Sequence, residues 1–135
     1  MTLETLKPAA RARLDDDLII WFTTVSPAGQ PQTSPVWFVV DGGDILVYSK
    51  RSVRLANVAT HPKVAMNLDG DGEGGAIVTI EGTARIDDET PSPDEHDAFF
   101  AKYRKKLESY EWTIGYFAEH YPVPVRIAVD RVRAF

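Results

Sequence analysis

The connections between the first strand-forming segments of this sequence are too short for anything except antiparallel pairing. Residues 18–24, 32–40 and 45–49 are rich in β-branched, aromatic and leucine side chains, which favour strands. Residues 26–30 have the composition of a turn, and residues 41–44, Asp-Gly-Gly-Asp, carry a hairpin signal. A parallel connection needs about a dozen residues or more. The sequence therefore predicts consecutive antiparallel strands and not a doubly wound sheet.

The rest of the chain adds three predicted strands and four predicted helices. The strands are expected at residues 63–68, 76–86 and 125–135, and the helices at 3–13, 50–60, 92–107 and 112–121. The apolar alternation of the last strand changes phase near Asp130, which predicts a β-bulge there. Gly82 and Ala84 permit a close approach or a bend in the long strand before it. Six antiparallel strands in 135 residues predict a mainly β single domain, residues 1–135, built as a barrel.

The third helix has a strong predicted start and two predicted faces. Ser92, Pro93 and Glu95 have the spacing of a capping box, so we expect the helix to begin there. Its apolar stripe is expected at Phe99, Tyr103 and Leu107. The basic residues beside that stripe are predicted to face solvent: Lys102, Arg104, Lys105 and Lys106.

Composition excludes several classes of chemistry. The chain has no cysteine, so thiol nucleophiles, cysteine-ligated metals and disulfides are ruled out. The three histidines fall in separate predicted elements, and no metal site is expected. No apolar run approaches the roughly 20 residues of a membrane span. With a net charge of −5, we expect a cytoplasmic protein with no membrane or nucleic-acid partner.

The charge is nevertheless concentrated in a way that predicts an anionic ligand. Residues 45–68 carry four basic side chains and no acid, which leaves −9 for the remainder of the chain. Ser49, Lys50, Ser52 and Arg54 lie where a strand gives way to a helix, and unpaired backbone N–H groups there attract anions. Cations at a helix N-terminus oppose the helix dipole, and a bound phosphate relieves that repulsion. A solvated basic helix start with no ligand is the alternative.

The strand upstream supplies a second predicted contact. Pro35 cannot donate a hydrogen bond to a neighbouring strand, so it indicates an edge or an irregularity. Backbone groups around Thr33–Val36 are then free to contact a flat heterocycle. Trp37 and Phe38 point to opposite faces, so at most one of them reaches such a ligand.

Taken in order, these motifs resemble a known family. The pattern is G-x-P-x-x-S-P-V-W-F, a D-G hairpin, V-Y-S-K…R-L-x-N-V…H-P-K-V and I-x-G-T-A. It is similar to the pyridoxamine 5′-phosphate oxidase-like, FMN-binding split barrels. Within them it most resembles the actinobacterial branch of flavin/deazaflavin oxidoreductases that use coenzyme F420.

The resemblance implies a six-stranded antiparallel split β-barrel that forms a homodimer, with the cofactor at the subunit interface. It implies a small unsaturated or quinone-like substrate and hydride transfer from reduced F420, with no catalytic side chain assigned. Tyr48 is one possible proton donor. The cofactor-binding residues that it implies are Thr33, Ser34, Pro35, Val36, Tyr48, Ser49, Lys50, Arg51, Arg54 and Asn57. Two alternatives stay open: an FMN-dependent oxidoreductase, or a non-catalytic flavin- or deazaflavin-binding protein.

Overall fold

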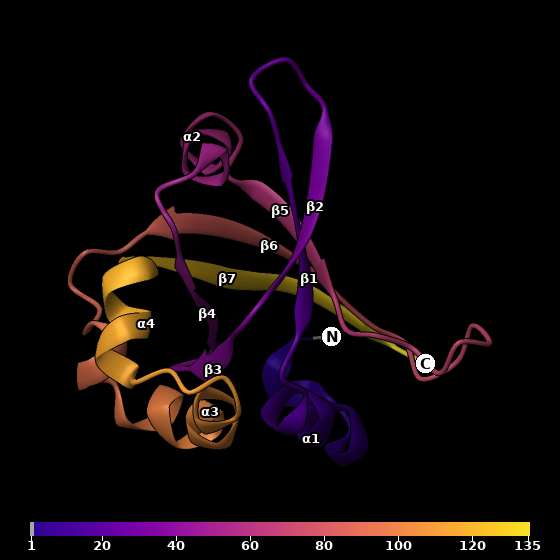
Figure 1. Cartoon of the computed structure of the whole chain (residues 1–135). Helices are drawn as coiled ribbons and strands as arrows, with labels where there is room; N and C mark the ends of the chain where they lie inside the picture. The colour runs from indigo at the N-terminus through magenta and orange to yellow at the C-terminus, as the bar shows by residue number, and fades with distance from the viewer. Residues whose placement is uncertain (1) are drawn as a thin grey trace.

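The computed structural model describes residues 2–135 and contains one curled antiparallel sheet with helices around it (Figure 1). Its seven strands are β1 (Ile20–Val25), β2 (Pro31–Val36), β3 (Val39–Asp41), β4 (Asp44–Ser49), β5 (Lys63–Asn67), β6 (Val78–Ile86) and β7 (Val123–Ala134). The helices are α1 (Pro8–Asp16), α2 (Val53–Thr60), α3 (Asp97–Ser109) and α4 (Ile114–His120), with short 3-10 turns at Leu3–Thr5 and Pro93–Glu95. The strand order is β2-β1-β5-β6-β7-β4-β3, and every pairing is antiparallel, as predicted.

The sheet has seven strands instead of six because the strand predicted at 32–40 is two strands. β2 pairs with β1 and β3 pairs with β4, so the two halves lie at opposite edges of the sheet. The break falls at Trp37 and Phe38. The buried backbone of Phe38 bonds to α3, since its N–H donates to the Tyr103 hydroxyl at 2.7 Å and its carbonyl accepts from that hydroxyl at 2.9 Å. A side chain of α3 thus replaces the neighbouring strand at this point.

Two predicted irregularities of the sheet are confirmed. The register between β6 and β7 shifts after Glu81, because Arg131 pairs with Glu81 but Val129 pairs with Gly82. Asp130 is therefore the extra residue of the bulge. A Cβ at Gly82 would lie 2.8 Å from the Ala128 carbonyl oxygen and would also collide with Ile127, so glycine permits the close approach of β7.

The predicted bounds of the first and third helices are wrong: the first begins at Pro8 instead of residue 3, after a separate 3-10 turn at Leu3–Thr5. The first α-helix continues to Asp16, beyond the predicted end at residue 13, and Arg13 pairs with Asp17 at 2.8 Å across its last turn. The third α-helix begins at Asp97, because the backbone N–H of Phe99 donates to His96 Nδ1 at 3.2 Å. Ser92 instead donates to the Asp94 carboxylate at 2.6 Å, and Pro93–Glu95 form only a 3-10 turn.

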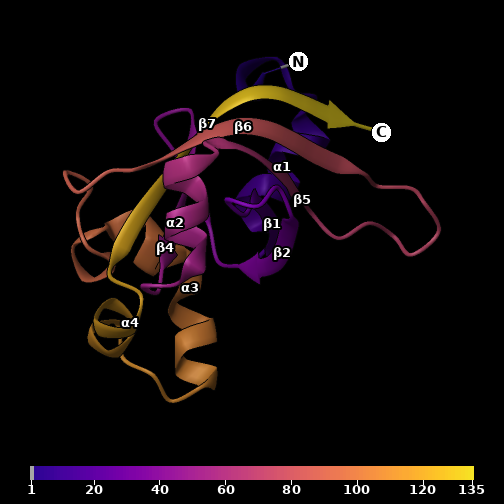
Figure 2. The ribbon, with the colours of Figure 1, turned by 90° about the horizontal axis from the view of Figure 1, so that it is seen from above.

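Two buried clusters hold the fold and shape the space between them. One fills the inside of the curled sheet and includes Phe22, Phe38 and Ile127. The other packs α3 and α4 against β3 and β4, and it contains the predicted stripe Phe99, Tyr103 and Leu107. Figure 1 shows α2 and the α3–α4 pair at separate parts of the sheet, and in Figure 2 β6 and β7 run side by side across the top of the view. The sheet therefore fixes the position of the α2 N-terminus relative to these two helices.

The prediction that Lys102 faces solvent is wrong, because this side chain of α3 is partly buried against α1. Its ammonium group lies 3.7 Å from the centre of the Phe38 ring and donates to the Leu14 carbonyl at 3.2 Å. Burial lowers the pKa of Lys102 to about 8, although the aspartates at 15–17 oppose the shift. The other three basic residues stay at or near the surface.

The lowered pKa of Lys102 predicts that its contribution to the unfolding free energy depends on pH. In the unfolded chain its pKa is about 10.4, so between about pH 8 and pH 10 the unfolded state binds the proton and the folded state releases it. That difference raises the unfolding free energy as pH increases across this window. We expect urea denaturation to show the wild type gaining stability relative to Lys102→Met from pH 8 to pH 10. Parallel pH profiles for the two proteins would contradict this.

Candidate functional site

A cavity of about 600 Å³ opens between the N-terminal end of α2, the end of β2 and the α3–α4 turn. The position of α2 is fixed by Asn57, whose amide donates to Thr24 at 3.0 Å and to Gln32 at 2.8 Å. The walls differ in character: one end is basic and the other aromatic. The lining residues are Ile19, Pro35, Val36, Trp37, Tyr48, Lys50, Ser52, Arg54, Tyr110, Trp112, Phe117 and Tyr121.

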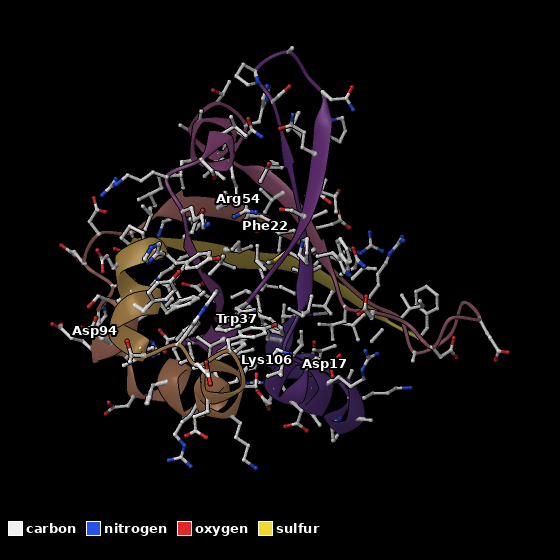
Figure 3. The ribbon with its side chains drawn as sticks, viewed as in Figure 1. Asp17, Phe22, Trp37, Arg54, Asp94 and Lys106 are labelled. Atoms are coloured by element: carbon white, nitrogen blue, oxygen red, sulfur yellow. The ribbon has the colours of Figure 1, made fainter. Side chains whose placement is uncertain are left out.

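Arg54 is the central cation of the basic end. Its guanidinium donates to the Ser49 hydroxyl at 3.2 Å and also to the Ser34 hydroxyl. It lies 5.7 Å from the centre of the Phe22 ring, and Figure 3 shows it directed inward beside that ring. Burial lowers the pKa of Arg54. Within residues 2–135 none of the ion pairs includes Arg54. A desolvated cation held only by hydroxyls favours an anionic ligand.

The residues around Arg54 complete this basic end. Ser49 is fully buried, and its hydroxyl accepts from Arg54 while donating to the Lys50 carbonyl at 2.8 Å. Ser52 is the N-cap of α2 but makes no side-chain capping bond, so its hydroxyl is free for a ligand. Lys50 is exposed, and its ammonium lies 5.2 Å from the centre of the Tyr121 ring. Arg54 and two hydroxyls thus surround the N-terminus of α2, and Lys50 extends from the same turn toward the aromatic end of the cavity.

The structure brings together part of the predicted cofactor-binding set. Pro35, Val36, Tyr48, Lys50 and Arg54 line the cavity, and the hydroxyls of Ser34 and Ser49 lie behind it on Arg54. Three other residues lie outside the lining. Thr33 is exposed and bonds to Thr23 at 2.7 Å, Arg51 is exposed on the turn before α2, and Asn57 is buried beneath that helix. Cofactor contacts from all ten residues stay predictions.

Tyr48 lines the cavity with its ring, but its hydroxyl points elsewhere. The hydroxyl donates to the Pro91 carbonyl at 2.5 Å, and the residue is buried. Burial raises the pKa of Tyr48, and the nearby Asp41 carboxylate raises it further. In this geometry its proton is held by the protein, and a role as proton donor would require the Pro91 bond to break.

The aromatic end of the cavity was not predicted as part of the site. Tyr110, Trp112, Phe117 and Tyr121 form it. Glu111 between the first two adopts a left-handed φ of 59°, and the N–H of Trp112 returns to the Leu107 carbonyl at 2.9 Å. This tight turn directs both neighbouring rings to the cavity. The density of aromatic residues over 110–121 was the available signal.

Two further properties bear on function. Across residues 2–135 there is no group of three or more histidine, aspartate and glutamate side chains placed to hold a metal ion. In the same part of the chain, every helix is too short or too polar to cross a membrane.

Comparison with known proteins gives a family and a set of similar folds. The family model described as pyridoxamine 5′-phosphate oxidase matches residues 6–133. No curated protein matches the sequence. Among solved structures, the conserved hypothetical protein Rv2991 from Mycobacterium tuberculosis has a TM-score of 0.72 at 23% identity, covering 97% of this chain and 85% of that one. An F420 reductase has a TM-score of 0.68 at 20% identity, covering 95% and 98%. HutZ, the heme storage protein from Vibrio cholerae, has a TM-score of 0.65 at 16% identity, covering 99% and 95%.

Proposed function

The chain belongs to the pyridoxamine 5′-phosphate oxidase family, with the split-barrel fold of that family, and from this premise we propose that it is an F420-dependent oxidoreductase. Its substrate is a small unsaturated or quinone-like molecule that accepts hydride. The observation that carries the proposal is Arg54, a desolvated guanidinium held by Ser34 and Ser49 at a helix N-terminus. A partly buried cation of this kind is well placed to bind the phosphate of a cofactor.

The cavity residues fit a phosphate-bearing flavin or deazaflavin. A volume of about 600 Å³ is within the usual range for small-molecule sites, about 300–1,000 Å³. Arg54, Ser52 and the first N–H groups of α2 are the phosphate ligands in this proposal. Pro35 and Val36 at the edge strand offer a flat surface to the ring system.

Each part of the site has a role that follows from its chemistry. The reduced cofactor, when bound, supplies the hydride. Arg54 and Ser52 fix the cofactor by its phosphate, which sets the position of its ring. The aromatic rings at the other end exclude water and orient a flat substrate against that ring.

Two alternatives have specific support. FMN carries a single phosphate. Arg54 with the hydroxyls of Ser49 and Ser52, here called the Arg54 cluster, is suited to bind a single phosphate group. A non-catalytic binding protein is favoured by the Tyr48 hydroxyl, because it donates its proton to the Pro91 carbonyl and so cannot give it to a substrate in this geometry. A protein named for heme storage has a similar fold, although fold alone does not determine function.

Cofactor titration tests the proposal. Trp37 and Trp112 line the cavity, so their fluorescence should change when a ligand enters it. We expect F420 to bind at micromolar concentration, more tightly than FMN, with affinity falling at high salt because the contact is ionic. Tighter binding of FMN would replace F420 by FMN in the proposal. If neither cofactor binds at micromolar concentration, both enzymatic functions are wrong.

We further propose that the protein is a homodimer that buries the outer face of its sheet. A second hollow, of about 510 Å³, lies on this face among residues of β1, β5 and β6. Val25 and Ala65 in it are apolar, and Lys63 and Asp130 form an ion pair at 3.4 Å on its rim. Sedimentation equilibrium should give about twice the 15.0 kDa chain mass. In Ala65→Arg, placed on this face, we expect the monomer. A wild-type monomer at micromolar concentration would contradict the proposal.

A further inference from the structure

A column of stacked rings leads from the core of the protein to the aromatic end of the cavity. Trp37 stacks on Tyr103 with centroids 4.5 Å apart and planes 5° from parallel. Trp37 also stacks on Phe117 at 5.0 Å and 8°, and Phe117 stacks on Tyr121 at 4.5 Å and 14°. Tyr103 is fully buried, whereas Tyr121 is half-buried and lines the cavity. The column is held rigidly at its inner end, so Tyr121 is a fixed surface on which a further planar ring can stack.

Lys50 gives this end of the cavity its charge. Its ammonium lies 5.2 Å from the Tyr121 ring centre, and within residues 2–135 it belongs to none of the ion pairs. The cavity lining contains Lys50 and Arg54 but no aspartate or glutamate. The side chain is exposed, so rotation about its own bonds can move the ammonium from the ring face to an anion beside Tyr121. This end of the cavity therefore combines a stacking surface with an unpaired cation.

We propose that Tyr121 and Lys50 form a subsite for a planar aromatic or conjugated carboxylate. The ring of the ligand stacks on Tyr121 and its carboxylate pairs with the Lys50 ammonium. The subsite uses Lys50 and Tyr121, whereas the proposed function assigns the cofactor phosphate to Arg54. Identification of this ligand class as the substrate rests on the proposed oxidoreductase function, whereas the binding itself does not.

Calorimetric titration of the cofactor-free protein with 2-naphthoate tests the subsite. At about 0.15 M salt the protein should bind 2-naphthoate at least about five-fold more tightly than 2-naphthamide, which lacks the charge, or decalin carboxylate, which is not planar. Lys50→Gln should reduce the affinity for 2-naphthoate to that for 2-naphthamide. Tyr121→Leu should weaken binding about five-fold or more, and Tyr121→Phe should preserve it because the ring remains.

Arg54→Gln separates the two ends of the cavity in the same experiment. We expect this variant to bind 2-naphthoate within about two-fold of the wild type, because its charge lies at the phosphate end. A larger loss in Arg54→Gln than in Lys50→Gln would place the carboxylate at the phosphate end and overturn the proposal. Equal affinity for the acid and the amide, or no binding at millimolar concentration, would also overturn it. Because no cofactor is present, failure here is distinguishable from failure of the cofactor titration.

Discussion

Replacement of Arg54 by methionine is expected to weaken the binding of a phosphate-bearing flavin by about 1.5–3 kcal/mol, the range for a hydrogen bond to a charged group. The same substitution should leave the unfolding free energy of the cofactor-free protein unchanged or raise it. The reason is that Arg54 is desolvated, and Ser34 and Ser49 provide hydroxyls but no compensating negative charge. Methionine retains an apolar stem against Phe22. Binding and stability should therefore respond differently to the same change.

Comparison of FMN with riboflavin assigns this effect to the phosphate. Arg54→Met should lower the affinity for FMN and leave that for riboflavin nearly unchanged, because riboflavin has the same ring but no phosphate. Arg104→Met is the matched control, since it removes the same charge from the exposed face of α3. Equal losses for FMN and riboflavin would mean that Arg54 contacts the ring or only supports the fold. A clear loss of stability in the cofactor-free variant would favour the structural role.

The sheet was predictable wherever its pattern is local. The Asp41–Asp44 hairpin needs glycines at positive φ, and Gly42 and Gly43 adopt 59° and 85°. The bulge at Asp130 is visible in the sequence because a single extra residue reverses which side chains face the core. Information of this kind lies within a few residues along the chain, so composition and alternation are sufficient to detect it.

Two features that the local pattern does not indicate were missed. The break between β2 and β3 requires the hydroxyl of Tyr103, which is 65 residues away in sequence from Phe38. The start of α3 was misplaced because His96 outcompetes Ser92 as the cap, and histidine is an uncommon cap residue. Neither contact has a signature in the local pattern.

The candidate site divides in the same way. The basic end could be predicted because Ser49, Lys50, Ser52 and Arg54 are consecutive or nearly so, at one strand-to-helix junction. The aromatic end could not, because Tyr121 reaches the cavity only after α4 packs on the sheet beside Trp37. Helical spacing of aromatic residues usually indicates core packing, and for Phe117 that interpretation is also correct.

Arg126 connects three separate segments of the chain, and its replacement by methionine is expected to cost about 3 kcal/mol of unfolding free energy. Its side chain is 13% exposed, and its guanidinium lies 2.7 Å from Asp41, 3.6 Å from Asp44 and 3.3 Å from Asp87. It also donates to the Thr90 hydroxyl at 2.7 Å. Among residues 2–135, Arg85 is then the only arginine or lysine that still pairs with any of these three carboxylates.

The loss should depend on pH in a specific direction. The hydrogen bond from Arg126 holds the pKa of Asp41 below its usual value. The resulting stabilisation is therefore present above about pH 4 and disappears as pH falls through the lowered pKa of the folded state. Urea denaturation should show a large gap between wild type and Arg126→Met at pH 7, and a smaller gap near pH 3. Arg104→Met should stay within about 0.5 kcal/mol of wild type at both pH values, because it is an exposed substitution. A loss below about 1 kcal/mol at pH 7 in Arg126→Met, as for an ordinary surface ion pair, would show that the three segments are held together by packing alone.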